Sequence, residues 1–167
     1  MTTKKFIAPL VVFSFALSLA GCGDKGPAVQ FVEGTVSFDG NLIDNCSVTF
    51  SPKDKSDSST GVNRPLLSSG LTDAKGHFRL SAVMGGAIGG GTTVGEYAVC
   101  IVKKEPVPQR NLNQRPGEGT PEPEYRYITP RIFEEEGTTP ITLKVEKGKN
   151  RFDFDLKADG SFTVNGQ

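Results

Sequence analysis

His77 is the only histidine in the chain, so it is the first residue to weigh as a general base. A catalytic triad needs a histidine beside an activated nucleophile and an orienting acid. Asp73 is near in sequence, but hairpin turns commonly place an aspartate close to another polar residue. We therefore interpret His77 as an exposed polar residue of a strand and expect no enzymatic activity. A single histidine also excludes a His-rich zinc site.

Asp153 and Asp155, with Asp159 downstream, are the residues closest in type to a calcium loop. Calcium sites need several oxygens that converge on one point, usually with a bidentate glutamate. Asp153 and Asp155 instead alternate with phenylalanines, which explains them as the solvent face of a strand. We expect no metal and no cofactor.

The segment from Met84 to Gly95 reads MGGAIGGGTTVG and invites comparison with a phosphate-binding loop. Such a loop ends in Lys-Ser/Thr and opens a helix, and neither feature is present. We expect a flexible hinge or a bulged connection between two strands.

Tyr125 and Tyr127 flank Arg126 where a proline-rich segment ends. Exposed aromatic rings can stack on sugars, so the two tyrosines are a candidate ligand surface. Sugar-binding sandwiches usually use exposed tryptophan, and the chain has none. The alternative is that the tyrosines close the edge of the fold.

Alternating apolar residues predict the elements that carry these side chains. The central stretch is Thr72 to Ile101, with one strand around Phe78 and Leu80 and another from Tyr97 to Ile101. Further strands are expected at 31–38, 43–50, 66–71, 141–145 and 152–156, with the last two forming a hairpin. Asp39-Gly40 predicts a hairpin turn.

These strands predict an all-β fold, a single antiparallel two-sheet sandwich of about seven strands. We expect it to span residues 29–158, interrupted by a proline-rich excursion at 105–124 that leaves the sheet. Residues 159–167 form a tail that adds a short edge strand.

The charge balance argues against nucleic acid as a partner. The 19 acidic and 19 basic side chains cancel, and loss of a leader that holds Lys4 and Lys5 leaves the chain slightly acidic. Nucleic-acid binding needs a concentrated basic face.

The first 21 residues have the composition of a cleaved secretory signal peptide. Lys4 and Lys5 precede an apolar run from Phe6 to Ala20, which is short for a membrane-spanning helix. The run ends in Leu-Ala-Gly-Cys at Cys22, which resembles the bacterial lipobox. That resemblance implies lipidation of Cys22, with palmitate-type acyl chains, and a bacterial cell-envelope location. Residues 22–28 form a tether, and the choice of membrane stays open.

The ordered motifs of the body carry a second resemblance. They are V-x-G-x-V-x-x-D-G from Val32, T-D-x-x-G-x-F-x-L from Thr72, G-x-Y-x-V-x-I from Gly95 and G-x-N-x-x-x-F-D-L from Gly148. Together they resemble the carboxypeptidase regulatory-like, or transthyretin-like, sandwich of bacterial (planctomycete-type) lipoproteins. The resemblance implies a prealbumin-type sandwich without catalysis. One relative of the wider fold is a hydrolase that uses several histidines, so its site does not carry over.

Cys46 and Cys100 remain once Cys22 is lipidated. Export favours oxidation, and an even pair is what a disulfide needs. The transthyretin-like strand order implies that their strands are neighbours in one sheet. The alternative is two buried thiols.

Two functions follow from these observations. The first is a membrane-anchored, non-catalytic β-sandwich for protein–protein contact or spacing in the cell envelope. The second is a solute- or carbohydrate-binding surface lipoprotein with its site near the glycine-rich gap and the tyrosines.

The lipid anchor generates a direct prediction. Cells grown with radioactive fatty acid are expected to label the wild-type protein at Cys22, because two or three acyl chains give stable anchoring. Cys22→Ala is expected to lose all label; a labelled Cys22→Ala protein would contradict the anchor.

Overall fold

A computed structural model describes residues 28–54, 65–84, 87–108 and 123–166. The predicted signal peptide, Cys22 and the middle of the proline-rich segment lie outside these residues. Within them no helix is long and apolar enough to cross a membrane.

Over the described residues the structure is all-β, as predicted, with one 3-10 turn, η1 (Arg131–Phe133). The strands are β1 (Phe31–Phe38), β2 (Asn41–Leu42), β3 (Ser47–Pro52), β4 (Ser68–Leu71), β5 (His77–Arg79), β6 (Ser81–Met84), β7 (Ala87–Gly90), β8 (Gly95–Val102), β9 (Lys104–Pro106), β10 (Tyr125–Tyr127), β11 (Thr142–Val145), β12 (Lys149–Leu156) and β13 (Phe162–Asn165).

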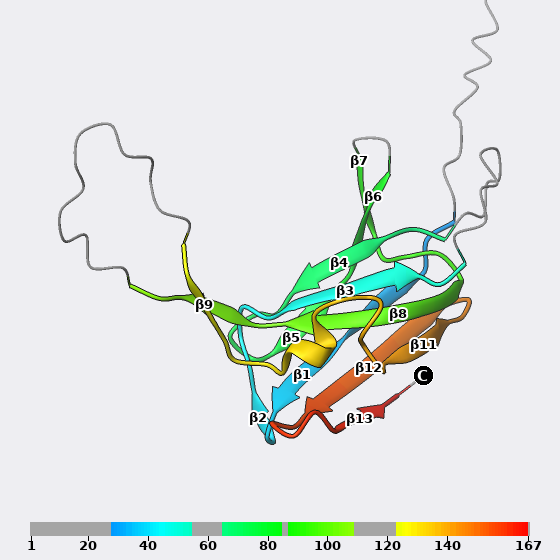
Figure 1. Ribbon diagram of the computed structural model, residues 1–167. Coiled ribbons are helices and arrows are strands. Elements are labelled where there is room, and N and C mark those ends of the chain that lie inside the picture. The colour runs from blue at the N-terminus through cyan, green and yellow to red at the C-terminus, as the bar shows by residue number, and fades with distance from the viewer. Residues whose placement is uncertain (1–27, 55–64, 85–86, 109–122, 167) are drawn as a thin grey trace, which may run out of the picture.

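These strands form two large sheets and a small ribbon (Figure 1). The first sheet has the order β13-β12-β1-β2, with β5 also paired to β1. The second sheet has the order β11-β8-β3-β4-β6-β7. Strands β9 and β10 pair only with each other and project from the body.

One apolar core lies between the two large sheets. Val32 and Val36 of β1 and Val48 and Phe50 of β3 are fully buried in it. The Phe50 ring lies 6.1 Å from that of Phe152 in the opposite sheet, so the two layers are in direct contact. The alternation of apolar residues that predicted the strands is the pattern that fills this core.

The chain passes from one sheet to the other at Leu80. Strand β5 pairs with β1 in the first sheet, and β6 pairs with β4 in the second. Between them the Leu80 amide donates to Val32 O at 3.0 Å, and its carbonyl accepts from Gly91 N at 2.8 Å. Leu80 is completely buried, so this crossing point holds the layers together through both backbone and side chain.

Buried hydroxyl groups form a hydrogen-bond network at the start of β8. Tyr97 is fully buried, and its hydroxyl lies 3.1 Å from Thr92 Oγ1 and 2.9 Å from Thr93 Oγ1. Thr92 Oγ1 also donates to the carbonyl of Leu66 at 2.9 Å. A buried phenol without partners would be costly, so this network explains a tyrosine in the core.

Strand direction and pairing differ from the prediction at two places. Strands β1 and β12 run parallel, with Phe31 opposite Lys149, so the first sheet is not wholly antiparallel. The predicted hairpin of 141–145 with 152–156 is wrong, because β11 pairs with β8 and β12 pairs with β1. Period-two alternation indicates which face is buried but contains no information on strand direction or partner.

Local backbone chemistry accounts for further differences. The predicted strand 43–50 is interrupted at Asn45, whose φ of 48° is incompatible with a ladder. The first part of the glycine-rich gap, for which a flexible hinge or a bulged connection was expected, belongs to an antiparallel pair, because Ser81–Met84 of β6 pairs with Ala87–Gly90 of β7. The proline-rich excursion begins later than expected, since Lys104–Pro106 forms a ladder with Tyr125–Tyr127. Residues 109–122 lie outside the described part.

Two boundary predictions are confirmed. Strand β1 spans Phe31–Phe38 and turns at Asp39-Gly40 into β2. The tail forms the edge strand β13, which pairs with β12.

Gly34 generates the stability prediction for this fold. An added Cβ would lie 1.7 Å from Phe152 O and 2.9 Å from Phe78 Cε1. Gly34→Ala is therefore expected to lower the free energy of unfolding by about 3 kcal/mol or more. Urea unfolding measures it.

Gly137→Ala is the matched control, because its added Cβ would meet no described atom within 4 Å. Its change is expected within about 0.5 kcal/mol. Equal unfolding midpoints for Gly34→Ala and the wild type would contradict the packing described here.

Candidate functional site

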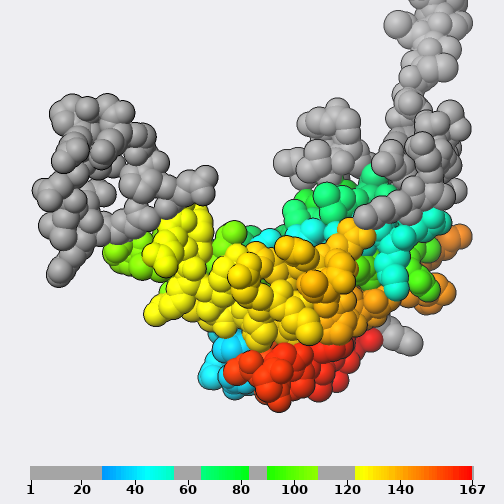
Figure 2. Space-filling model, in the orientation of Figure 1, coloured from blue at the N-terminus to red at the C-terminus, as the bar shows by residue number. Residues whose placement is uncertain are grey.

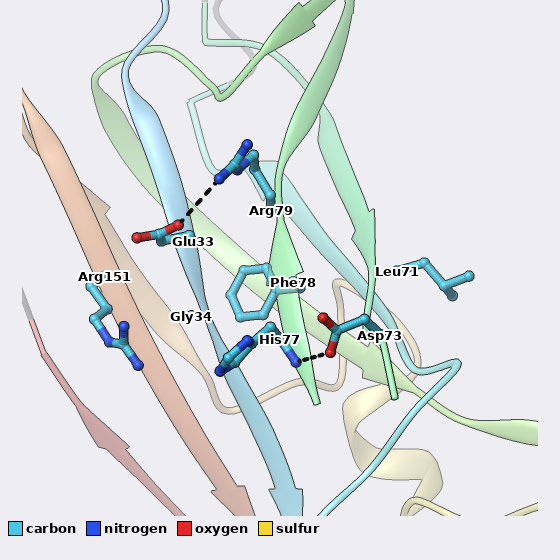
Figure 3. A pocket seen from close by; sticks show the side chains of 8 residues that line it. All are labelled: Glu33, Gly34, Leu71, Asp73, His77, Phe78, Arg79 and Arg151. Atoms are coloured by element: carbon cyan, nitrogen blue, oxygen red, sulfur yellow. Dashed lines mark hydrogen bonds and ion pairs between the residues drawn. The ribbon is translucent and has the colours of Figure 1, made fainter. Parts of the chain in front are cut away.

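A groove with a volume of about 570 Å³ lies on the outer face of the first sheet (Figure 3). We call it the arginine groove. Its lining residues are Glu33, Gly34, Leu71, Asp73, His77, Phe78, Arg79 and Arg151.

Strand register places three charges in one row across the groove. Glu33 of β1 lies opposite Arg79 of β5 on one side and Arg151 of β12 on the other. Arg79 lies 3.7 Å from the Glu33 carboxylate, and its guanidinium lies 4.8 Å from the centre of the Phe31 ring. Both arginines are more than half exposed, so each pair contributes little to stability.

The second arginine is held by a neighbouring aspartate. Arg151 donates to both oxygens of Asp153, at 3.1 and 3.2 Å, and Thr35 Oγ1 donates to Asp153 Oδ1 at 2.8 Å. Burial opposes ionisation of Asp153, but the hydrogen bonds from Arg151 and Thr35 outweigh it and keep the pKa below its ordinary value.

His77 lies in the groove with two acids, yet neither is arranged to orient its ring. The Asp73 carboxylate accepts the backbone N–H groups of His77 at 2.9 Å and Lys75 at 2.8 Å. These two bonds lower the pKa of Asp73. In Figure 3 the dashed line from Asp73 ends on the His77 backbone, and the imidazole points away from it.

The residues that line the groove include no serine, threonine or cysteine, and Thr35, which lies opposite His77 in the ladder, donates its hydroxyl to Asp153. The arrangement can hold charged groups through its arginines and glutamate, but it offers no nucleophile–base pair.

The candidate calcium ligands do not converge in the structure. Asp153 bonds to Arg151 and Thr35, whereas Asp155 lies 2.6 Å from Lys157. Both aspartates are half-buried and alternate with buried residues of β12, which confirms that they lie on the side of the strand away from the core. Among the described residues no group of three or more His, Cys, Asp or Glu side chains is placed to hold a metal ion.

The possible disulfide between Cys46 and Cys100 is not formed, and both are buried free thiols. Cys46 belongs to the core, where burial raises its pKa to about 12. Cys100 lies opposite Thr49 on the outer face of the second sheet. Their strands are neighbours, as expected, but the two side chains lie on opposite faces and out of register.

The two tyrosines lie on the β9–β10 pair, which we call the tyrosine ribbon. Tyr125 is 43% exposed, and Lys104 Nζ lies 4.9 Å from its ring centre. On the other side of the ribbon, Arg126 forms an ion pair with Glu105 at 2.8 Å.

Tyr127 joins the ribbon to the body. Its hydroxyl donates to Glu134 Oε1 at 2.6 Å, and the Arg131 guanidinium lies 4.7 Å from its ring centre. Arg131 also donates to Glu134 Oε2 at 3.3 Å. The hydrogen bond from Tyr127 lowers the pKa of Glu134 and raises that of Tyr127. In Figure 2 this segment forms a continuous surface ridge from β10 through η1 to β11.

The glycine-rich gap and the tyrosines do not form one site. Thr92 and Thr93 lie just before the start of β8, whereas β9 follows its end. The length of β8 therefore separates the two regions, and a ligand site built from both is not assembled.

The alternation of apolar residues predicted neither the arginine groove nor the contacts that Glu134 and Arg131 make with Tyr127. Glu33, Arg79 and Arg151 are brought together only by the register of three strands that are distant in sequence. Comparison with family models, curated proteins and solved structures found no match to this chain.

The Tyr127–Glu134 bond generates a pH prediction. The folded-state pKa of Glu134 lies below the ordinary glutamate value of 4.5, so the stability it contributes is present above that value and is lost as pH falls through the folded pKa. Tyr127→Phe is expected to raise the pKa of Glu134, because the donor is removed. A carboxyl NMR titration measures this change.

Tyr125→Phe is the control, since the Tyr125 hydroxyl has no hydrogen bond within the described part of the chain. It is expected to leave the Glu134 titration unchanged. An unaltered titration in Tyr127→Phe would show that the bond does not hold the carboxylate.

Proposed function

We propose that this chain is a lipid-anchored lipoprotein of the bacterial cell envelope whose non-catalytic β-sandwich contacts other envelope proteins through the tyrosine ribbon. The observation that carries this proposal is the position of the ribbon relative to the end where the described chain begins. The two lie at opposite ends of β8.

Two contacts define these ends. Gln30 forms a bridge with Thr92, immediately before β8, so the chain enters the body beside the first residues of that strand. Strand β9 follows the last residues of β8. A strand of eight residues spans about 25 Å at roughly 3.3 Å per residue. A chain anchored at Cys22 would therefore present the ribbon on the side away from the membrane (Figure 1).

The residue types of the ribbon suit a protein partner. Tyrosine and arginine dominate the binding energy of protein interfaces, and Tyr125, Arg126 and Tyr127 are consecutive here. Val107 beside them is 37% exposed. An isolated two-stranded sheet is only marginally stable, so a partner that packs on this ribbon would complete its burial.

The arrangement of the body supports the absence of catalysis. The arginine groove combines His77 with acids, but the closest acid in sequence, Asp73, is committed to backbone amides. The two packed sheets and their shared core support the proposed transthyretin-like, carboxypeptidase regulatory-like sandwich.

Photocrosslinking at Tyr125 tests the ribbon contact. A photoreactive phenylalanine analogue at this position is expected to give a discrete protein adduct in intact cells, because the side chain is 43% exposed at the distal end. The same analogue at Val94, which is 39% exposed near the start of β8, is the matched control and is expected to give none.

A protein adduct at both positions, or at neither, would overturn the proposed ribbon contact. A glycan array separates the sugar-binding alternative. Saturable glycan binding that Tyr125→Ala and Tyr127→Ala abolish would replace the protein-contact proposal with that function.

A further inference from the structure

We infer that the β11–β12 turn, with Lys147 and Lys149, is a docking surface for an anionic lipid bilayer and holds the body upright on the membrane. This inference rests on the proposed anchoring at Cys22. It goes further, because it assigns a membrane-facing surface to the folded domain itself.

The turn lies at the end where the chain enters the body. Gly148 N donates to Gln30 Oε1 at 2.7 Å, and Lys149 is paired with Phe31 at the start of β1. A surface hollow of about 370 Å³ is lined by Ala28, the first described residue, together with Lys147 and others. The lysines are therefore next to the point from which the tether continues toward Cys22.

The length of the tether limits how far this end can be from the membrane. Six residue steps connect Cys22 to Ala28, and in any conformation they span at most about 20 Å. The turn therefore stays within about 20 Å of the lipidated residue, which is of the same order as the screening length of roughly 10 Å.

The charges of this turn are complementary to an anionic surface. Lys147 and Lys149 are exposed, and within the described ranges neither forms an ion pair. Lys144 forms an ion pair with Glu146 at 3.4 Å, and Glu96 is its cross-strand neighbour in the ladder, so these three residues add no net positive charge. The net positive charge of the turn thus comes from the two lysines at its tip.

The residues around the turn do not cancel the positive charge of the two lysines. Lys53 and Asp54 follow β3 at the same end, and their opposite charges add up to zero. Val94 lies in the same hollow as Lys147 and is 39% exposed, so the surface pairs apolar area with cations. Lysines beside exposed apolar side chains are the combination that lipid interfaces favour.

The opposite end has the reverse charge. The three acids of the run Glu134-Glu135-Glu136 face two basic neighbours, Arg131 and Lys104, and both Asp155 and Asp159 act on Lys157. Carboxylates are therefore in excess at the end from which the ribbon leaves. An anionic bilayer would attract the tether end and repel the ribbon end, which selects one orientation.

The test uses the chain from residue 22, coupled through the Cys22 thiol to a maleimide lipid in preformed vesicles. Cys46 and Cys100 are buried with raised pKa values, so the coupling favours Cys22. Chemical coupling makes the result independent of whether cells acylate Cys22. The absence of fatty-acid label would contradict the proposed lipid anchor. The absence of protection on vesicles would contradict the docking surface alone.

Hydrogen exchange followed by mass spectrometry reports on the turn at residues 144–149, with the hydrogen-bonded turn at residues 157–161 as internal reference. Phosphatidylcholine vesicles with phosphatidylglycerol are expected to slow exchange at 144–149, and pure phosphatidylcholine vesicles or high salt to remove that protection. Each lysine is expected to favour the docked state about fivefold. Lys147→Glu with Lys149→Glu should therefore lower the protection at least about tenfold.

Lys75→Glu with Lys104→Glu is the matched control, since it makes the same change in net charge with exposed lysines away from the tether end. It is expected to keep the protection. Equal exchange on both kinds of vesicle, or protection that survives Lys147→Glu with Lys149→Glu, would overturn the docking surface.

Discussion

Close packing around Gly34 is the constraint on which the rest of the structure depends. At this residue β1 lies between β12 and β5, and the Phe152 carbonyl occupies the space where a side chain would begin. Because β1 can approach both neighbours, the first sheet forms with its apolar face intact. That face then closes the core against Phe50 of the second sheet. The register that creates the arginine groove follows from the same pairing.

The sequence predicted the parts of this fold that depend on local pattern. Alternation identified the buried faces of β1, β8 and β12, and Asp39-Gly40 identified a turn, because each signal lies within a few consecutive residues. Partner choice depends on contacts between distant residues, so the parallel pairing of β1 with β12 had no local signal. For the same reason the pairing of β6 with β7 was missed: a ladder needs only backbone groups, and glycine supplies them.

For the candidate sites, too, residue type and local pattern were predictable from the sequence, whereas contacts between distant residues were not. Tyr125 and Tyr127 were identified from their residue type, and the structure places them on one ribbon. The support of Tyr127 by Glu134 and Arg131 depends on how η1 folds back onto the ribbon, which residue type alone does not indicate. Cys46 and Cys100 show a local signal that was not used. Cys46 is in phase with the buried Val48 and Phe50, whereas Cys100 falls between the buried Val99 and Ile101, so alternation alone already puts the two thiols on different faces.

The pairing of β1 also has a mechanical consequence. This strand is the first one of the described body. Strand β12 pairs with it along its whole length, from Phe31 to Phe38, and β5 pairs with it from Glu33 to Thr35. A force that pulls the body away from its anchor along the strand axis would load these hydrogen bonds simultaneously rather than one at a time. Strand β1 would resist such a pull in shear, which is the mechanical property that the proposed membrane anchor and partner contact would require.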